Sequence, residues 1–461
     1  MRRRVGKCDR FLMKGIAAMS AKTIVIADDL TGANATGVLM RKQGLSAFVC
    51  LYTDGKTTED MNELNLDMQS NFDTVIYTTD SRNIEKSEAY SRVKTVCKSF
   101  KATENIHFSK RIDSTLRGNI KAELDAMCEI FTEHCILVMP AFPGAGRYCI
   151  NGLLYLGEKL LEDTEVTKDP LFPVNSSEVC EILNIDKTSH ISIAIVESGK
   201  EAVCKELRQL YQEGKRIIVI DAQTNEHLQT AAAAAVQSNI PFITSDPGPF
   251  TSYTSGMIQN RNRMHSGLEM QVNQRKSFVS DEKRKILLSI GTSVQITKTQ
   301  IDLLCRKYQV GKAEMILENL LESPEKEIVR LQDILIKSDE SILLLHTDSL
   351  RKGVRIEAGD RNEELSELIK KAFADLTVQV WEKDSAIDTI ICSGGDITSA
   401  ICKKAGASGI EIIEEIAPLI SFGRISEENR YPGRKLYMIT KGGLAGDTDA
   451  FVRCIQFLQS R

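Results

Sequence analysis

Short apolar runs rich in β-branched residues alternate with longer amphipathic segments from residue 23 onward. The short runs predict strands, and the longer segments predict helices. In the first half of the chain the predicted strands are 23–27, 47–52, 74–79, 106–110, 135–140, 191–196 and 216–221. The clearest helices between them are 85–101, 118–132, 199–213 and 224–238. This alternation is typical of an α/β fold with a mainly parallel sheet.

A second alternating unit follows a polar stretch at 265–284. Its predicted strands are 285–291, 341–347, 388–396 and 436–443. Its predicted helices are 295–307, 323–337 and 360–381. We therefore expect two α/β domains with mainly parallel sheets, 23–264 and 285–461, joined by a linker at 265–284. An active site is expected in the cleft between them.

Composition favours a small-molecule partner. The chain has 461 residues, enough for two such domains, because single cores stop growing at about 250–300 residues. A net charge of −4 argues against a nucleic-acid binder, which normally carries a clustered basic face. No run reaches the roughly 18 apolar residues of a membrane span. The sequence leaves the alternative of a homo-oligomer open.

The N-terminal segment and the cysteines add two expectations. Residues 1–22 are rich in Lys and Arg and have broken apolar runs, so we interpret them as a disordered extension, with a transit peptide as the alternative. The 12 cysteines are scattered without a C-x-x-C pair, which favours single thiols in a reducing compartment, the cytoplasm. They predict no metal site.

Two aspartates follow the first predicted strand, in "IVIADDLTGAN". Ligands of open α/β sheets bind at the carboxyl ends of strands, so both are candidate site residues. Asp29 or Thr31 is also suited to cap the helix that follows. Because neighbouring strand residues point to opposite sides, one carboxylate could cap while the other, from Asp28 or Asp29, faces the cleft.

Cations and a further carboxylate follow other strands of this unit. Arg82 comes after the third strand, and "KRIDSTLRGN" brings Lys110, Arg111 and Asp113 after the fourth. Arginine offers a planar fork of donors that suits carboxylates and phosphates, and lysine adds a compact charge. Arg147 lies in a glycine-containing loop, "AFPGAGR", for which a purely structural turn is the alternative. Together these residues predict a pocket for a small hydroxylated anion.

Glycine turns follow three strands of the second unit, each before a predicted helix. Backbone N–H groups at a helix start, reached through glycines, bind anions, so three such turns predict a polyphosphate site. The candidate residues are Gly291, Thr292, Ser293, Gly394, Gly395, Asp396, Ile397, Lys441, Gly442, Gly443, Leu444, Gly446 and Asp447. No P-loop, zinc-protease or serine-hydrolase motif is present, and no G-x-G-x-x-G follows the first strand of either unit.

These motifs in this order resemble the four-carbon acid-sugar kinases, which use ATP to phosphorylate the terminal hydroxyl of threonate, erythronate or 3-oxo-tetronate. The resemblance runs from about residue 23 to the C-terminus through "IADDLTGAN", "KRIDSTLRGNI", "PAFPGAGR", "DPGPF", "SGGD" and "TKGGLAGD". It implies an acid-sugar-binding domain followed by a nucleotide-binding domain. The "KRIDSTLRGN" stretch is more similar to the threonate and erythronate branch.

The resemblance also suggests roles. We expect Arg82 and Lys110, supported by Arg111, to bind the substrate carboxylate. We expect Asp28 or Asp29 to deprotonate the hydroxyl, and Asp113 to hold the inner hydroxyls. The second-unit turns would bind ATP, with Mg²⁺ held by Asp396 or Asp447.

Two departures from the family pattern concern the nucleotide site. Ile397 replaces a hydroxyl residue, which Thr398 or Ser399 would have to supply, and Leu444 alters the last turn. A 3-oxo-tetronate kinase and a non-catalytic sensor of ATP and sugar acid stay as alternatives.

Overall fold

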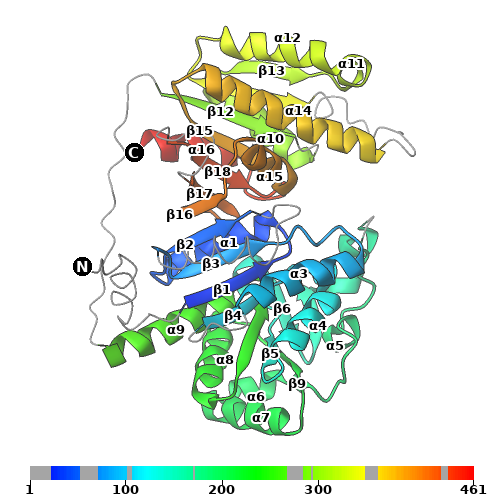
Figure 1. Ribbon diagram of the computed structural model, residues 1–461. Helices are drawn as coiled ribbons and strands as arrows, with labels where there is room; N and C mark the ends of the chain where they lie inside the picture. The colour runs from blue at the N-terminus through cyan, green and yellow to red at the C-terminus, as the bar shows by residue number, and fades with distance from the viewer. Residues whose placement is uncertain are drawn as a thin grey trace, which may run out of the picture.

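One sheet of 15 strands runs through the whole molecule (Figure 1). The computed structural model describes residues 22–51, 71–100, 106–169, 172–266, 284–291, 294–347, 362–426 and 435–461. The α/β class predicted from the alternating pattern is confirmed. The two predicted units share this one sheet instead of each forming its own.

The N-terminal half supplies a wholly parallel part of the sheet, in the order β2-β3-β1-β4-β11-β5-β10-β9. These strands are β1 (Lys22–Ala27), β2 (Ala47–Cys50), β3 (Thr74–Thr78), β4 (Ile106–Arg111), β5 (Cys135–Val138), β9 (His190–Ile191), β10 (Ile217–Ile220) and β11 (Phe242–Asp246). Strands β6 (Arg147–Ile150), β7 (Leu153–Leu156) and β8 (Lys159–Leu160) form a separate antiparallel sheet. The helices are α1 (Leu30–Lys42), α3 (Lys86–Phe100), α4 (Ile120–Ile130), α5 (Val179–Ile182), α6 (Ile193–Glu197), α7 (Lys200–Gln212), α8 (Asn225–Ser238) and α9 (Pro249–Ser266).

The C-terminal half continues the sheet in the order β13-β14-β12-β15-β18 with parallel pairing. Its strands are β12 (Lys285–Ile290), β13 (Gly311–Met315), β14 (Ile342–Thr347), β15 (Ile387–Ser393), β16 (Gly409–Ala417), β17 (Ile420–Ile425) and β18 (Tyr437–Lys441). Its helices are α10 (Gln295–Lys307), α11 (Leu317–Glu322), α12 (Pro324–Ile336), α14 (Asn362–Lys383), α15 (Gly395–Lys404) and α16 (Ala450–Gln459).

An antiparallel hairpin, β16–β17, joins the two halves. It pairs with β18 on one side and with β2 on the other. Figure 1 shows α1 next to this junction, beside α15 of the other half. One apolar core crosses it, because buried Leu30 and Val38 of α1 belong to the same cluster as Phe373 and Trp381 of α14.

The order of the strands shows where ligands should bind. β1 lies between β3 and β4, and β12 lies between β14 and β15. In such sheets the crevice opens where connections leave a strand in opposite directions, at the carboxyl ends. This rule selects the end of β1, with Asp28, and the end of β12, with Gly291.

Some predicted elements were wrong or missed. The apolar run 191–196 forms only the short β9 and then turns into α6. Strands β11, β13, β16 and β17 were not predicted, and the loop expected around Arg147 forms the β6–β8 sheet.

Other predictions fall largely outside the described residues. Residues 1–21 and 267–283 are not described, so the N-terminal extension, the linker and the domain bounds stay predictions. Within the described ranges the cysteines form no disulfide, and most are buried, as expected of single thiols. Among the helices described, none is long and apolar enough to cross a membrane.

Candidate active site

β1 ends at two consecutive aspartates. Asp28 follows the strand and is only 2 % exposed. Asp29 has an extended backbone and caps α1, because its Oδ1 accepts the N–H of Gly32 at 2.7 Å. Of the two candidate caps, Asp29 and Thr31, the structure therefore selects Asp29. Its second carboxylate oxygen stays available for a different partner.

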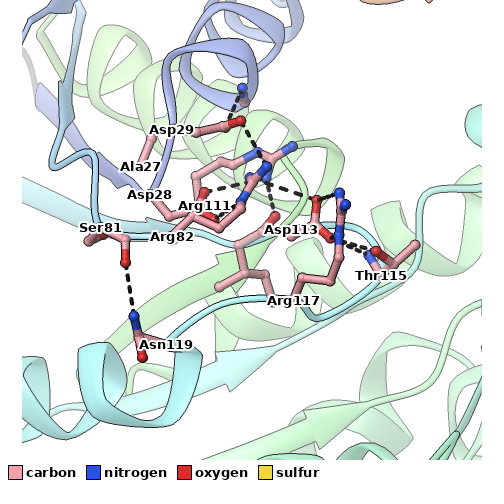
Figure 2. Close-up of polar contacts among 12 residues, drawn as sticks. Ala27, Asp28, Asp29, Ser81, Arg82, Arg111, Asp113, Thr115, Arg117 and Asn119 are labelled. Atoms are coloured by element: carbon pink, nitrogen blue, oxygen red, sulfur yellow. Dashed lines mark hydrogen bonds and ion pairs between the residues drawn. The ribbon is translucent and has the colours of Figure 1, made fainter. Parts of the chain in front are cut away.

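That partner is Arg82, which contacts three carboxylates (Figure 2). Its Nε donates to Asp28 Oδ2 at 2.7 Å, and its Nη1 lies 2.8 Å from Asp29 Oδ2. Its Nη2 lies 3.7 Å from Asp113 Oδ1. The residues come from the ends of β1, β3 and β4, so the predicted acids and this arginine do meet at one edge of the sheet.

Asp113 is also held by its own loop. Its Oδ2 accepts the Thr115 hydroxyl at 2.5 Å and Arg117 Nε at 2.9 Å. Arg117 in turn donates to Asp169 at 3.1 Å. Burial alone would raise the pKa of Asp113, but Arg82 and Arg117 hold it well below its usual range. Asp113 is therefore an acceptor that stays ionised.

Arg111 passes close to the start of α1. Its Nη1 lies 3.8 Å from Asp28 Oδ1 and also donates to the backbone carbonyl of Ile112. A Cβ on Gly32 would lie 2.6 Å from Arg111 Cζ, so any side chain there would displace the guanidinium. The glycine of "DDLTGAN" thus lets the guanidinium approach Asp28.

Lys110 does not face this cluster in the way that we expected. Its side chain is 0 % exposed, and its Nζ lies 3.0 Å from Glu123 Oε2. The same Nζ donates to the carbonyl of Arg111 at 3.0 Å, and Glu123 also accepts the Ser81 hydroxyl. A direct contact of Lys110 with a substrate carboxylate is therefore corrected to an internal role, which neutralises Glu123 behind the site.

Glu123 was missed by sequence reasoning, although a signal was present. It lies on the buried face of α4, with Ile120 three residues before it and Met127 four residues after it. An acid at an apolar position of an amphipathic helix requires a buried partner.

The pKa values of the two adjacent aspartates are shifted in opposite directions. Burial would raise the pKa of Asp28, but Arg82, Lys110 and Arg111 together lower it below its usual value. Burial raises the pKa of Asp29, and the neighbouring charge of Asp28 adds to this against the effect of Arg82. Asp29 is therefore the more basic of the two carboxylates.

Arg147, at the start of β6, differs from the other arginines of the site. Burial lowers the pKa of its guanidinium, Asp113 opposes this, and Arg117 adds to it, so it lies within range of their charges. Within the described chain it forms no ion pair with a carboxylate, and its buried Nε has no acceptor. Among the described residues, its Nη1 donates to the carbonyl of Ala145. Arg147 thus keeps donors for a bound anion.

In the C-terminal half, β15 turns into α15 through Gly394, whose φ of 103° suits glycine. The N–H groups of Gly395, Asp396 and Ile397 open the helix and have no acceptor among the described residues. A Cβ on Gly394 would meet nothing within 4 Å, so the space above the turn is open. This arrangement fits a phosphate.

The side chain of Ile397 points away from this space. It is 7 % exposed and packs over Gly291, where a Cβ would lie 2.9 Å from Ile397 Cδ1. The hydroxyl of Thr398 donates to the carbonyl of Gly394 at 2.8 Å and is thereby used within the helix. Ile397 can therefore contribute its backbone N–H, and Thr398 does not supply the missing hydroxyl. For Ser399 this role stays a prediction.

The second glycine turn, residues 442–447, is held by its carbonyl groups. Lys441 Nζ donates to the carbonyls of Gly442 and Gly443 at 2.9 and 3.0 Å, and burial lowers its pKa to about 8. Gln300 of α10 donates to the carbonyls of the last three turn residues, Ala445, Gly446 and Asp447. Gln300 was not predicted, because nothing local marks a helix glutamine as the support of a turn that is distant in sequence.

The remaining nucleotide-site candidates are less well placed. Leu444 is 79 % exposed, and the Asp447 side chain is 90 % exposed. Thr292 and Ser293 lie outside the described residues, next to Gly291 at the end of β12. In the described ranges no three His, Cys, Asp or Glu side chains gather into a metal site. Mg²⁺ usually binds one or two carboxylates together with substrate phosphates, which exposed Asp396 or Asp447 could provide.

The acid cluster and the glycine turns meet at the start of α1. A Cβ on Gly395 would lie 2.9 Å from Thr31 Oγ1, and one on Gly442 would lie 3.4 Å from Thr31 Cγ2. Lys403 of α15 reaches back to Asp80 at the end of β3, with 3.3 Å between Nζ and Oδ2. A small cavity between the halves is lined from both sides, by α1 and by the turns after β15 and β18.

Comparison with known proteins agrees with the division into an N-terminal half with the acid cluster and a C-terminal half with the glycine turns. A sequence profile described as a sugar-binding N-terminal domain matches residues 23–254, and one described as a nucleotide-binding C-terminal domain matches 287–451. A crystal structure of a Haemophilus influenzae protein has the same fold, with a TM-score of 0.70 and 22 % identity over 94 % of this chain and 99 % of that chain.

Named relatives extend over nearly the whole chain. The D-erythronate kinase of Heliobacterium modesticaldum is 30 % identical over 96 % of this chain and 98 % of its own length. The D-threonate kinase of Salmonella typhimurium is 26 % identical over 95 % of this chain and 98 % of its own. The 3-oxo-tetronate kinase of Actinobacillus succinogenes is 25 % identical over 93 % and 97 %. With its two matching domains and these relatives, the chain belongs to the four-carbon acid-sugar kinase family.

Proposed function

We propose that this protein transfers the γ-phosphoryl group of ATP to the terminal hydroxyl of D-erythronate or D-threonate. The observation that carries the proposal is the position of Thr31. It comes two residues after Asp29 in the chain and lies against the glycine turns that follow β15 and β18. A sugar acid held by the cluster and a nucleotide held by the turns would therefore meet at the start of α1.

On the acceptor side, we propose that Arg147 binds the carboxylate of the sugar acid. Arg82 and Arg117 already contact aspartates, whereas Arg147 has donors that no described residue accepts. Asp113 would accept the inner hydroxyls of the sugar acid. Arg82 would then mainly hold Asp28 and Asp29 in place, a supporting role that differs from the direct contact expected from the sequence.

Asp29 is proposed as the base. Its side chain is 26 % exposed, compared with 3 % for Asp28, so a hydroxyl can reach it. Its raised pKa also makes it the better proton acceptor of the two. Asp28 would fix Arg82 and Arg111 and raise the basicity of its neighbour.

On the donor side, the N–H groups of 395–397 and of Gly443, Leu444 and Gly446, which have no acceptor among the described residues, would bind the phosphates of ATP. Mg²⁺, bound with the nucleotide, would neutralise phosphate charge with help from Asp396 or Asp447. Phosphoryl transfer depends mostly on positioning and charge neutralisation, which these groups supply. We propose the bounds 23–264 for the sugar-binding domain and 285–461 for the nucleotide-binding domain, and a location in the reducing cytoplasm.

A coupled assay of ADP release tests the proposal with D-erythronate, D-threonate, L-threonate and 3-oxo-tetronate. We expect kcat/KM to be highest for D-erythronate or D-threonate. A preference for 3-oxo-tetronate would move the protein to the other branch of the family. Binding of ATP and an acid by calorimetry, with no phosphorylated product by mass spectrometry, would support a sensor instead and reject the kinase proposal.

A further inference from the structure

The β6–β8 sheet carries Arg147 but lies outside the main sheet. Three isolated β-bridges attach its backbone to other parts of the described chain: Phe142 with Arg147, Cys149 with Ala222 and Leu153 with Glu178. The first closes the tight loop just before β6, and the other two reach more distant segments. Buried Cys149 and Leu154 add apolar contact with the core. A sheet this small is marginally stable alone, so its position depends on a few attachments.

Asp221, directly after β10, supplies the densest of these attachments. Its side chain is 0 % exposed, and its Oδ2 accepts the N–H groups of Asn151 at 2.6 Å and Ile193 at 2.9 Å. Its Oδ1 accepts the N–H of Gly152 at 3.0 Å and the thiol of Cys149 at 3.2 Å.

A further contact comes from His190, whose Nε2 lies 2.9 Å from the same oxygen, Asp221 Oδ1. One buried carboxylate thus holds groups from two separate segments, the β6–β7 hairpin and the start of α6.

The hairpin transmits this attachment to Arg147. Asn151 and Gly152 form its turn with φ values of 53° and 76°, the geometry of a tight type I′ hairpin. Cys149 exchanges backbone hydrogen bonds of 2.9 and 3.0 Å with Ala222, the residue after Asp221. Arg147 precedes Cys149 by two residues in β6, on the same side of the strand.

We infer that Asp221 is a positioning residue that sets the place of Arg147 through the β6–β7 hairpin and thereby governs affinity for the substrate carboxylate. The inference rests on the proposed function, in which Arg147 binds that carboxylate. It gives a role to a buried acid that lies in none of the motifs singled out in the sequence.

The test compares Asp221→Asn, Arg147→Ala and the double variant by steady-state kinetics with D-erythronate and ATP. Asparagine keeps the size of the side chain but cannot accept N–H groups on both of its ends. We expect each single variant to raise KM for D-erythronate about tenfold, with kcat and KM for ATP within about twofold of wild type. The double variant should be no worse than Arg147→Ala, because both changes remove the same contact.

A matched control separates positioning from general destabilisation. Glu327 is a buried acid of the other half that accepts the N–H of Ile316 at 2.8 Å and pairs with Arg330. Glu327→Gln should lower the melting temperature without changing KM for D-erythronate. If KM rises equally in this control, or if the effects of the two single variants multiply in the double variant, the positioning role is rejected.

Hydrogen exchange gives a readout that is independent of turnover. Asp221→Asn should speed amide exchange in 147–156 while leaving exchange in β1 and β4 unchanged. If Asp221→Asn fails to fold, Gly152→Ala, which strains the same turn at its positive φ, takes its place with the same expected KM change.

The two proposals fail in different ways. Unchanged exchange in 147–156 rejects the positioning role even in an active enzyme. A wild-type protein that phosphorylates none of the four acids rejects the proposed function, and the role of Arg147 in carboxylate affinity falls with it. Faster exchange in the Asp221→Asn variant would then still show that Asp221 holds the hairpin.

Discussion

Asp28 and Asp29 are neighbours in the chain, yet their carboxylates lie in different surroundings. Asp28 is buried among Arg82, Lys110 and Arg111, whereas Asp29 caps α1 and is partly exposed. Sequence alone did not rank them, because the ranking depends on which cations the fold brings to each oxygen. Burial with opposing charges separates their pKa values, and this separation makes Asp29 the candidate base.

The base assignment predicts different outcomes for two variants. Asp29→Asn should lower kcat by about a hundredfold or more, since a positioned base contributes at least that much. Asp28→Asn should shift the acid limb of the kcat/KM profile to lower pH. The sign follows because removing the negative charge of Asp28 lowers the pKa of Asp29, which then stays ionised in more acidic solution.

The measurement is a pH series of kcat/KM with D-erythronate for wild type and both variants. Near-normal turnover of Asp29→Asn would place the base elsewhere. A shift of the acid limb of Asp28→Asn to higher pH would show that the charge of Asp28 does not raise the pKa of the base.

Lys110 illustrates a limit of sequence reasoning at this scale. A lysine at a strand end can face a ligand or a buried acid, and the choice depends on what packs behind the strand. Here Glu123 of α4 takes the ammonium. The charged residues were predicted at the correct strand ends, but which cation pairs with which acid could not be predicted from the sequence.

Among the elements, the turn at 442–447 depends on α10. Gln300 is buried and donates to the carbonyls of Ala445, Gly446 and Asp447 at 3.2, 3.1 and 2.9 Å. Thr297 adds a hydroxyl bond to the carbonyl of Gly443 at 3.2 Å. With these carbonyls held, the turn can present its N–H groups to a phosphate.

Gln300→Ala should therefore weaken nucleotide binding specifically. We expect KM for ATP to rise about tenfold, equivalent to one to two hydrogen bonds, with KM for the sugar acid unchanged. Gln332→Ala is a matched control, because Gln332 bonds to Gln379 on the far helices of the same half. If both variants have the ATP affinity of wild type, measured by calorimetry, the turn does not bind phosphate in the proposed way.

The elements that were predicted correctly have strong local patterns. Strands such as β1 and β12 are continuous buried runs, and helices such as α8 begin at a side-chain cap, here Thr224. The β6–β7 hairpin was missed although its Asn-Gly turn is a strong hairpin signal. The run 191–196 misled because Asp221, distant in sequence, accepts the N–H of Ile193 and starts a helix there.

At the scale of the whole molecule, the two halves are less separate than the polar stretch at 265–284 implied. Strand β16 reads "GIEIIEEIA", with glutamates between apolar residues, which hid it as a strand at the centre of a large sheet. Its pairing with β2 makes one sheet of two functional units. Strand β16 is stabilised by pairing with β2 and β17, so its local sequence alone does not identify it as a strand.

Gly409 makes this junction sterically feasible. It pairs with Cys50 at the start of β16, and a Cβ there would lie 2.3 Å from the carbonyl oxygen of Val49 and 2.4 Å from the ring of Phe48. Backbone cannot yield easily, so any side chain must push β16 away from β2. The β2–β16 pairing couples unfolding of the two halves. If either half unfolds, one of the two paired strands is lost and the shared core around α1 is exposed.

Gly409→Ala should therefore lower the free energy of unfolding by about 1–3 kcal/mol and split denaturant unfolding into two transitions, where wild type shows one. Gly256→Ala in α9 is the matched control, since the three atoms nearest its Cβ would all belong to the Gln43 side chain, at 3.2–3.6 Å, and none to the backbone. Urea titration followed by both fluorescence and circular dichroism measures this. The single Trp381 lies in the C-terminal half, so its fluorescence reports that half while circular dichroism reports both. Coincident transitions in Gly409→Ala would mean that the β2–β16 pairing does not couple the halves.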